Sequence, residues 1–173
     1  MNEFLNPEKI LNEIDLRENM NAADFGCGSG GWVAPLAHKL EKGTVYAIDV
    51  MEEPLSALRN KIEMQRLANI NIIKSDVEAK NGSKLISESL DLVLLTNLLF
   101  QIEDKKIVLE EAKRVLKSGG EVLVVEWLAN SSLGPQQERV SAEEVKKIAM
   151  EVGLKIKKEF GAGNYHYGLV LTK

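Results

Sequence analysis

Three aspartates in the first half of the chain each close a short apolar run that reads as a β-strand: Asp24, Asp49 and Asp76. The first is followed by a turn with glycines at positions 26, 28, 30 and 31, and a helical pattern begins at Trp32. Glycine leaves no Cβ between a ligand and the backbone, and the unpaired N–H groups of a first helical turn attract an anionic group. The turn therefore predicts a binding site for a small molecule that carries a carboxylate or a phosphate.

The glycine turn fits two classes of ligand. The string Gly26-x-Gly28-x-x-Gly31 satisfies the dinucleotide fingerprint, so a nicotinamide-dependent dehydrogenase is one reading. Asp24 favours another, because a carboxylate repels a diphosphate and attracts an ammonium group. Asp24 followed by Gly26-x-Gly28-x-Gly30 resembles motif I of the Rossmann-like, class I S-adenosylmethionine-dependent methyltransferases. The resemblance implies S-adenosylmethionine as cofactor, with the loop at its methionine end and Asp24 at its amino group, directly or through water.

The other two aspartates stand at positions that suit a nucleoside. Asp49 follows the glycines at about the twenty-residue spacing from which an acidic residue reaches a ribose, where it can accept two hydroxyl hydrogen bonds. In the resembled family, the position of Asp76 contacts the exocyclic amine of adenine, and the next backbone N–H, here that of Val77, meets a ring nitrogen. Carboxyl ends of parallel strands meet at one edge of a sheet, where open α/β folds bind ligands. We therefore expect the three aspartates to line one crevice.

The resemblance also implies further contacts in the loop and at the strand ends. The predicted cofactor-binding residues are Asp24, Gly26, Cys27, Gly28, Gly30, Trp32, Asp49, Val50, Asp76, Val77, Thr96 and Asn97. Cys27, the single cysteine, reads as a small residue tolerated in a tight turn rather than as a nucleophile. One cysteine excludes an internal disulfide and a multi-cysteine metal site, and no metal is expected.

Strands and helices that must position these residues alternate along the sequence. Strands are predicted at 21–24, 44–49, 71–76, 90–96, 121–126, 154–160 and 165–171, and helices from Asn6-Pro7-Glu8 onward and at 32–40, 51–67, 103–116 and 141–153. Asn6 and Ser141 are predicted to cap their helices, and Ser118-Gly119-Gly120 to end the helix before it in the left-handed conformation. The run 90–96 is almost continuously apolar, as in a strand that is buried on both faces.

The short loop at 161–164 makes the last two strands antiparallel. The predicted fold class is therefore α/β, a three-layer, doubly wound, mostly parallel seven-stranded sheet with an antiparallel C-terminal strand. Its strand order, 3-2-1-4-5-7-6, is that of the resembled methyltransferases, and nucleotide dehydrogenases lack the reversed strand.

Length and composition favour one domain in the cytoplasm. A chain of 173 residues suffices for one core and leaves no room for the second domain that a dehydrogenase usually carries. We expect a single methyltransferase domain over 1–173, with an N-terminal helical cap at 1–19 that can cover the cofactor and a Rossmann-like core at 20–173. A net charge of −4 offers no general attraction to nucleic acid or to an anionic membrane. We see no signal peptide and no apolar run of membrane-spanning length, and expect a monomer or homodimer without membrane insertion.

Residues after the fourth and fifth strands should border the methyl acceptor. Thr96 and Asn97 lead into the apolar segment 98–100, which lacks the aromatic-Pro or Asn-Pro-Pro-aromatic signature of adenine-amine DNA methyltransferases. Glu126 and Trp127 stand at the base of the polar loop 128–140, which is our predicted substrate-binding segment.

The C-terminal run Tyr-His-Tyr-Gly-Leu-Val at 165–170 resembles the closing strand of the ubiquinone/menaquinone-biosynthesis (type 11) methyltransferases. The catalytic residue is unknown, with His166, Glu126 and Tyr165 as candidates; His166 reads either as a base or as a hydrogen-bonded core histidine. A base is needed only if the acceptor keeps its proton at working pH. We expect transfer of the methyl group of S-adenosylmethionine to an unidentified acceptor, first of all a small or lipidic molecule. The alternatives are a protein or RNA acceptor, or a non-catalytic cofactor-binding module.

Overall fold

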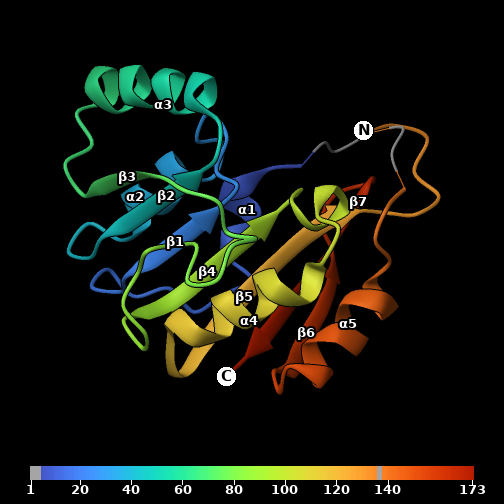
Figure 1. The fold of residues 1–173 in the computed structure, drawn as a ribbon. Coiled ribbons are helices and arrows are strands. Elements are labelled where there is room, and N and C mark those ends of the chain that lie inside the picture. The colour runs from blue at the N-terminus through green and yellow to red at the C-terminus, as the bar shows by residue number, and fades with distance from the viewer. Residues whose placement is uncertain (1–4, 136–137) are drawn as a thin grey trace.

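The computed structural model describes residues 5–135 and 138–173 and contains one seven-stranded sheet between two layers of helices (Figure 1). The elements in chain order are α1 (Pro7–Leu11), β1 (Ala22–Phe25), α2 (Val33–Lys39), β2 (Val45–Asp49), α3 (Glu52–Gln65), β3 (Ile70–Lys74), β4 (Leu90–Thr96), the 3-10 helix η1 (Leu99–Gln101), α4 (Lys105–Val115), β5 (Leu116–Trp127), α5 (Ala142–Glu151), β6 (Lys155–Gly161) and β7 (His166–Thr172).

The sheet has the strand order β3-β2-β1-β4-β5-β7-β6, which confirms the predicted topology. Strands β1 to β5 pair in parallel, whereas β7 runs antiparallel to both of its neighbours, β5 and β6. The carboxyl ends of the parallel strands therefore lie at one edge of the sheet. The loop 128–140 leaves β5 at that same edge.

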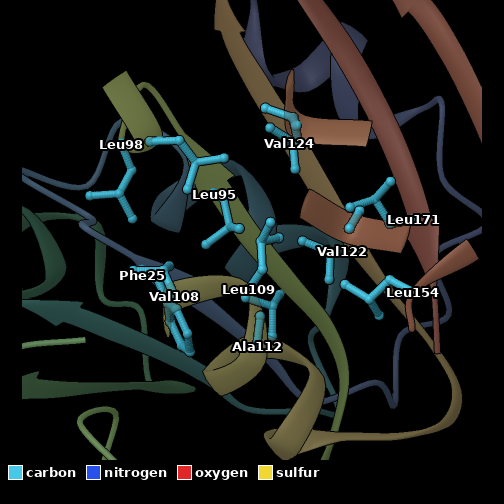
Figure 2. Packing of buried hydrophobic residues seen from close by; sticks show 14 of the residues in the cluster. Phe25, Leu95, Leu98, Val108, Leu109, Ala112, Val122, Val124, Leu154 and Leu171 are labelled. Carbon is cyan, nitrogen blue, oxygen red and sulfur yellow. The ribbon is translucent and has the colours of Figure 1, made fainter. Parts of the chain in front are cut away.

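Alternate residues of the central strands supply two separate apolar layers. In β4, Val93 and Leu95 face α4 and α5, while Leu92 and Leu94 face α1, α2 and α3. Figure 2 shows the first layer, where Val108, Leu109 and Ala112 of α4 pack against Leu95 and the strand residues beside it. Because both faces are covered, β4 is apolar at every position from Leu92 to Leu95, in agreement with the almost continuously apolar run in the sequence.

Two helix starts have the caps that their sequences predict. The Asn6 side chain accepts a hydrogen bond from Lys9 N at 3.2 Å, and Pro7 occupies the first helical position. The Ser141 hydroxyl accepts one from Glu144 N, also at 3.2 Å. Each bond satisfies a backbone donor that the first helical turn leaves unpaired.

The predicted glycine stop after α4 is wrong. The helix ends at Val115, and Leu116 already has extended backbone and pairs with Leu90 as the first residue of β5. Burial of the Leu116 side chain favours this direct passage from helix into sheet. Gly119, with φ +77°, instead lies within β5, at the irregularity between the Leu90–Leu116 and Leu92–Glu121 pairs, where its N–H donates to the carbonyl of Lys173.

The N-terminal helix packs on the sheet beside α2. Ile10 and Leu11 are buried against residues of α2 and against Trp32. Glu13 forms an ion pair with Lys158 of β6. Among the described residues, no helix combines the length and apolar character that a membrane crossing requires.

Candidate functional site

A cleft of about 250 Å³ lies at the carboxyl edge of the sheet, between the ends of β1, β2, β3 and β4. It is lined by Gly26, Ile48, Asp49, Val50, Met51, Ser75, Asp76, Val77, Glu78, Leu98, Gln101 and Ile102. Five of the residues predicted from the sequence meet here: Gly26, Asp49, Val50, Asp76 and Val77. None of the described residues of α1 is part of this lining.

The glycine loop is held tightly against its neighbours. The N–H groups of Gly26 and Cys27 both donate to the carbonyl of Ile48, at 2.8 and 3.0 Å. Gly26 has φ +70°, and a Cβ placed there would lie 2.6 Å from Leu98 Cδ1. Gly28 also has positive φ, but a Cβ there would meet no described atom within 4 Å. The loop is thus packed on one side at Gly26 and open to a ligand at Gly28.

Asp24 is a buried carboxyl group next to this loop. It has no exposed surface, and neither of its oxygens has a hydrogen-bond partner among the described residues. Burial, and secondarily the charge of Asp49, raises the pKa of Asp24 to about 8. A carboxylate is stable in such a place when a cation or hydrogen-bond donors accompany it. A ligand with an ammonium group would supply both.

Asp49 is fixed by the backbone rather than free to rotate. Its Oδ2 accepts from Gly28 N and its Oδ1 from Met51 N, both at 2.9 Å. Each carboxylate oxygen has lone pairs for further hydrogen bonds, so the half-buried side chain can still receive hydroxyl groups from the cleft. The sequence did not indicate that Asp49 also braces the glycine loop.

Asp76 and Val77 form the far wall of the cleft. Asp76 is exposed, and its Oδ1 accepts from Glu78 N at 2.9 Å, while Val77 is buried. The segment after β3 curls tightly, since a Cβ on Gly82 would lie 1.9 Å from the carbonyl oxygen of Asp76. Only a glycine at position 82 therefore fits beside the Asp76 carbonyl group.

Cys27 and Trp32 lie outside the lining of the cleft. Both are buried in the apolar layer that joins α1, α2 and α3, and Trp32 precedes α2 without a side-chain capping bond. Burial, followed by the charges of Asp24 and Asp49, raises the pKa of the Cys27 thiol. The thiol is therefore protonated at neutral pH, in agreement with a packing role.

Beyond β4 the chain makes a sharp turn. Thr96 is buried, and Asn97 has φ +51° with its N–H bonded to the carbonyl of Val125 at 2.8 Å. The Oδ1 atom of Asn97 is buried without a partner among the described residues. It is an acceptor for which a ligand N–H or O–H can be the donor.

Glu126 lies directly behind this turn. Its Oε1 accepts from Leu98 N at 2.8 Å and from Leu99 N at 2.6 Å. Burial raises the pKa of Glu126 to about 7, although the hydrogen bonds from Leu99 and Leu98 oppose that shift. A carboxylate at the end of a buried strand was the sequence signal for this residue, but its bonding partners were not predictable.

The predicted substrate loop is folded around one arginine. The Arg139 guanidinium donates to the carbonyls of Leu128, Ser131, Leu133 and Pro135, at 2.8 to 3.4 Å. No pattern in the sequence indicated this arrangement. Residues 136 and 137 of the loop lie outside the described residues.

The loop rests on Trp127 at the end of β5. Gly134 lies on the indole, where a Cβ would come within 2.6 Å of the ring. The ring centroids of Trp127 and His166 are 4.0 Å apart. The Leu128 N–H donates to the carbonyl of Tyr165. The structure thus brings the three catalytic candidates, His166, Glu126 and Tyr165, to the ends of β5 and β7, on the side of the turn away from Asp49.

His166 is neutral near physiological pH. It is buried, and burial followed by the positive charge of Arg139 lowers its pKa to about 4.

The neighbouring Tyr167, which the sequence did not single out, donates from its hydroxyl to the carbonyl of Val140 at 3.0 Å and so holds the far end of the loop.

Comparison with protein families and curated proteins gives related sequences. A family model described as "Methyltransferase domain" matches residues 16–164. A demethylmenaquinone methyltransferase of Bacillus mycoides (strain KBAB4) is 30% identical over 133 residues, which cover 75% of this chain and 54% of that protein. One from Geobacillus sp. (strain WCH70) is 28% identical over 131 residues, 75% of this chain and 55% of that protein. The chain spans about half the length of the curated relatives that it matches.

Solved structures share the fold. A S-adenosylmethionine-dependent methyltransferase from Aquifex aeolicus aligns with a TM-score of 0.87 and 30% identity, covering 96% of this chain and 89% of that chain. The [4+2]-cyclase SpnF aligns with a TM-score of 0.84 at 14% identity, covering 96% of this chain and 80% of that chain. The second likeness concerns the fold alone.

Proposed function

This chain belongs to the methyltransferase domain family, and we propose that it transfers the methyl group of S-adenosylmethionine to a small or lipidic acceptor. The observation that carries the proposal is Asp24, a fully buried carboxyl group beside a glycine loop, without a partner among the described residues. A ligand ammonium group would restore its charge and provide the missing hydrogen bonds. A dinucleotide would instead bring a diphosphate toward two aspartates, which electrostatics disfavours.

The residues around the cleft suit the other parts of the same cofactor. The open side of the loop at Gly28 suits the methionine end, and Asp49 has acceptor capacity left for the ribose hydroxyls. Asp76 and Val77 border the part of the cleft proposed for adenine. Thr96 and Asn97 follow at the end of β4, and the Asn97 Oδ1 atom is available to a donor from cofactor or acceptor.

When bound, S-adenosylmethionine supplies a methyl group on a positively charged sulfur, which is a good leaving group. The task left to the chain is to hold the acceptor in line and to exclude water, and such positioning can lower a barrier by several kcal/mol, up to about 7–11 in favourable cases. His166 with a pKa of about 4 is a weak proton acceptor. This low pKa disfavours His166 as the base that would take up a proton from the acceptor.

The proposed acceptor class is a hydroxylated ring of the quinol type. Support comes from the relatives named demethylmenaquinone methyltransferase and from the apolar side chain of Leu98 at the rim of the cleft. A second candidate is a different reaction, or cofactor binding without transfer, on the same fold. The likeness to a [4+2]-cyclase concerns the fold alone, and it is the reason to keep this alternative in the test below.

The test has a binding arm and a transfer arm. Calorimetric titration with S-adenosylhomocysteine should give saturable binding, and NAD should give none. Transfer from labelled S-adenosylmethionine is then measured with a reduced short-chain demethylmenaquinone, with an unfractionated protein extract and with tRNA. Methylation of the quinol supports the proposed acceptor class, and methylation of protein or RNA would assign a protein or RNA acceptor instead. Binding without transfer to any of the three favours the non-catalytic alternative, and absence of S-adenosylhomocysteine binding refutes the proposed function.

We also propose that residues 1–173 act as one domain, a helical cap at 1–19 on a core at 20–173, in the cytoplasm as a monomer or homodimer. The burial of Ile10 and Leu11 against α2 supports the assignment of the cap. Light scattering of the purified chain measures its assembly state.

A further inference from the structure

The turn at residues 97–99 connects the cofactor cleft to the end of β5. Leu98 lines the cleft, and its Cδ1 atom occupies the space that a Cβ on Gly26 would need. The residue before it, Asn97, is held in the left-handed region at φ +51°, which a non-glycine residue rarely adopts. The position of the Leu98 side chain therefore depends on whatever fixes this turn.

Glu126 is the side chain that fixes the turn. Its Oε1 accepts hydrogen bonds from two successive backbone donors, Leu98 N and Leu99 N. Glu126 has no exposed surface, and Leu98 and Leu99 are buried too, so solvent cannot readily replace the carboxylate as acceptor. Buried N–H groups without an acceptor are costly, and the turn would rearrange to find one.

Two more hydrogen bonds hold Asn97, the first residue of the turn. Asn97 N donates to the carbonyl of Val125, the residue before Glu126, at 2.8 Å. Gln101 Nε2 donates to the carbonyl of Asn97 at 2.9 Å. These bonds hold the start of the turn, whereas Glu126 holds the next two residues, where the Leu98 side chain lies against Gly26.

We propose that Glu126 is a positioning residue, whose carboxylate sets Leu98 against the glycine loop and so shapes the cofactor cleft without touching the cofactor or the acceptor. This inference rests on the proposed function, because the cleft is taken to bind S-adenosylmethionine. It replaces the role of catalytic base for which Glu126 was a candidate. A base and a positioning residue respond differently to substitution.

Glutamine separates the two roles. In Glu126→Gln the amide oxygen can still accept from both N–H groups, but the side chain can no longer take up a proton. Positioning predicts an affinity for S-adenosylhomocysteine within about threefold of the wild type and a retained kcat. A base predicts unchanged affinity with a kcat that falls by about 10²–10⁴-fold.

Shorter side chains test the positioning itself. Glu126→Asp keeps the charge but cannot reach both N–H groups, and Glu126→Ala removes the acceptor. Each should weaken S-adenosylhomocysteine binding at least about tenfold, the equivalent of one lost hydrogen bond to a charged group. Glu121→Ala is the matched control, because Glu121 lies in the same strand at the opposite edge of the sheet and should leave the affinity unchanged.

A double-mutant cycle tests whether Glu126 acts through Leu98. Leu98→Ala should weaken binding on its own, and the double variant with Glu126→Asp should bind no more than about twofold weaker than the worse single variant. All affinities are measured by calorimetry with S-adenosylhomocysteine, well below the unfolding temperature of each variant. If Glu126→Ala does not fold, the Asp and Gln variants still decide.

Wild-type affinity in folded Glu126→Asp, additive effects in the cycle, or a loss of kcat alone in Glu126→Gln would each overturn the inference. These outcomes leave binding by the wild type intact and so spare the proposed function. A wild-type chain that does not bind S-adenosylhomocysteine refutes the proposed function and this inference together.

Discussion

Replacing Asp24 by asparagine should make the ligand-free protein more stable at alkaline pH while it weakens cofactor binding. Burial raises the pKa of Asp24 from 3.8 to about 8. In the unfolded chain the group ionises near pH 4, whereas in the folded chain it stays protonated until about pH 8. Its contribution to the free energy of unfolding is therefore fully present at acidic pH and is lost as the pH rises through this window.

The magnitude follows from the width of the window. At about 1.4 kcal/mol per pH unit, a rise from 3.8 to about 8 corresponds to a penalty of roughly 5 to 6 kcal/mol at pH 8 and above. The neutral asparagine avoids this penalty, but its buried amide lacks partners at a cost of about 1–3 kcal/mol. We expect Asp24→Asn to be more stable than the wild type at pH 8.5 by roughly 2–5 kcal/mol, an increase in Tm of about 4–20 °C for a chain of this size.

The assay is thermal and urea unfolding at pH 5 and pH 8.5, without ligand. The stability gain of Asp24→Asn should shrink or vanish at pH 5, where the folded wild type holds Asp24 neutral. Asp91→Asn is the control, because both Asp91 oxygens have partners, Asn21 N and Lys117 Nζ, and its substitution should destabilise at both values of pH. A stability difference between Asp24→Asn and wild type that does not change with pH would refute the reasoning.

The same substitution should weaken cofactor binding, although it stabilises the ligand-free protein at alkaline pH. Loss of the carboxylate removes the partner proposed for the cofactor ammonium group, so affinity for S-adenosylhomocysteine should fall at least about tenfold at pH 8.5. In the wild type, affinity should weaken as the pH falls below about 8, because binding must first remove the Asp24 proton. In Asp24→Asn this slope should be absent. Calorimetry in two buffers of different ionisation enthalpy measures the proton released.

Three further substitutions test separate parts of the site. Asp49→Ala removes the acceptor for Gly28 N and the proposed partner of the ribose hydroxyls. It should weaken S-adenosylhomocysteine binding at least about tenfold in a folded chain. Unchanged affinity in a calorimetric titration contradicts the assignment of Asp49 to the ribose. Gly26→Ala forces a Cβ into the Leu98 side chain at positive φ and should lower Tm and affinity together. Gly31→Ala, where a Cβ would meet no described atom within 4 Å, should change neither Tm nor affinity by more than the error of the measurement. Arg139→Gln removes a charge that lowers the His166 pKa, so an NMR titration should show that pKa move upward from about 4. The same substitution removes hydrogen bonds to the loop carbonyls, so limited proteolysis should cut the loop faster. An unmoved pKa argues against the electrostatic effect on His166, and an equally protected loop argues against the role of Arg139 in holding the loop.

Local patterns in the sequence sufficed for the scaffold and for the cofactor edge. The alternation of strands and helices, the glycine turn and the aspartates at strand ends are all set by neighbouring residues. A parallel sheet necessarily gathers such strand ends at one edge. Asp49 and Asp76 therefore line one cleft, together with Val77, whereas Asp24, the third aspartate expected there, is fully buried and is not part of the lining.

The glycine stop after α4 failed for a physical reason. A left-handed glycine ends a helix only where the residues before it do not leave the helix earlier, for example to pair with a strand. Leu116 had a place beside Leu90 in the sheet and an apolar layer for its side chain, so the helix gave way to strand three residues before Gly119. That gain depends on a partner far away in the sequence.

What the sequence determined by itself is the backbone frame and the kinds of groups at its edge, because helix and strand periodicities, caps and glycine turns act over a few residues. Only the tertiary structure decided what those groups do. Glu126 accepts hydrogen bonds from Leu98 N and Leu99 N, and Arg139 donates to carbonyl groups of the loop. Asp24 is buried without a hydrogen-bond partner among the described residues. Each of these outcomes depends on which residues, distant in the sequence, pack beside a side chain and on how completely they exclude water from it. Local sequence patterns predict neither of these.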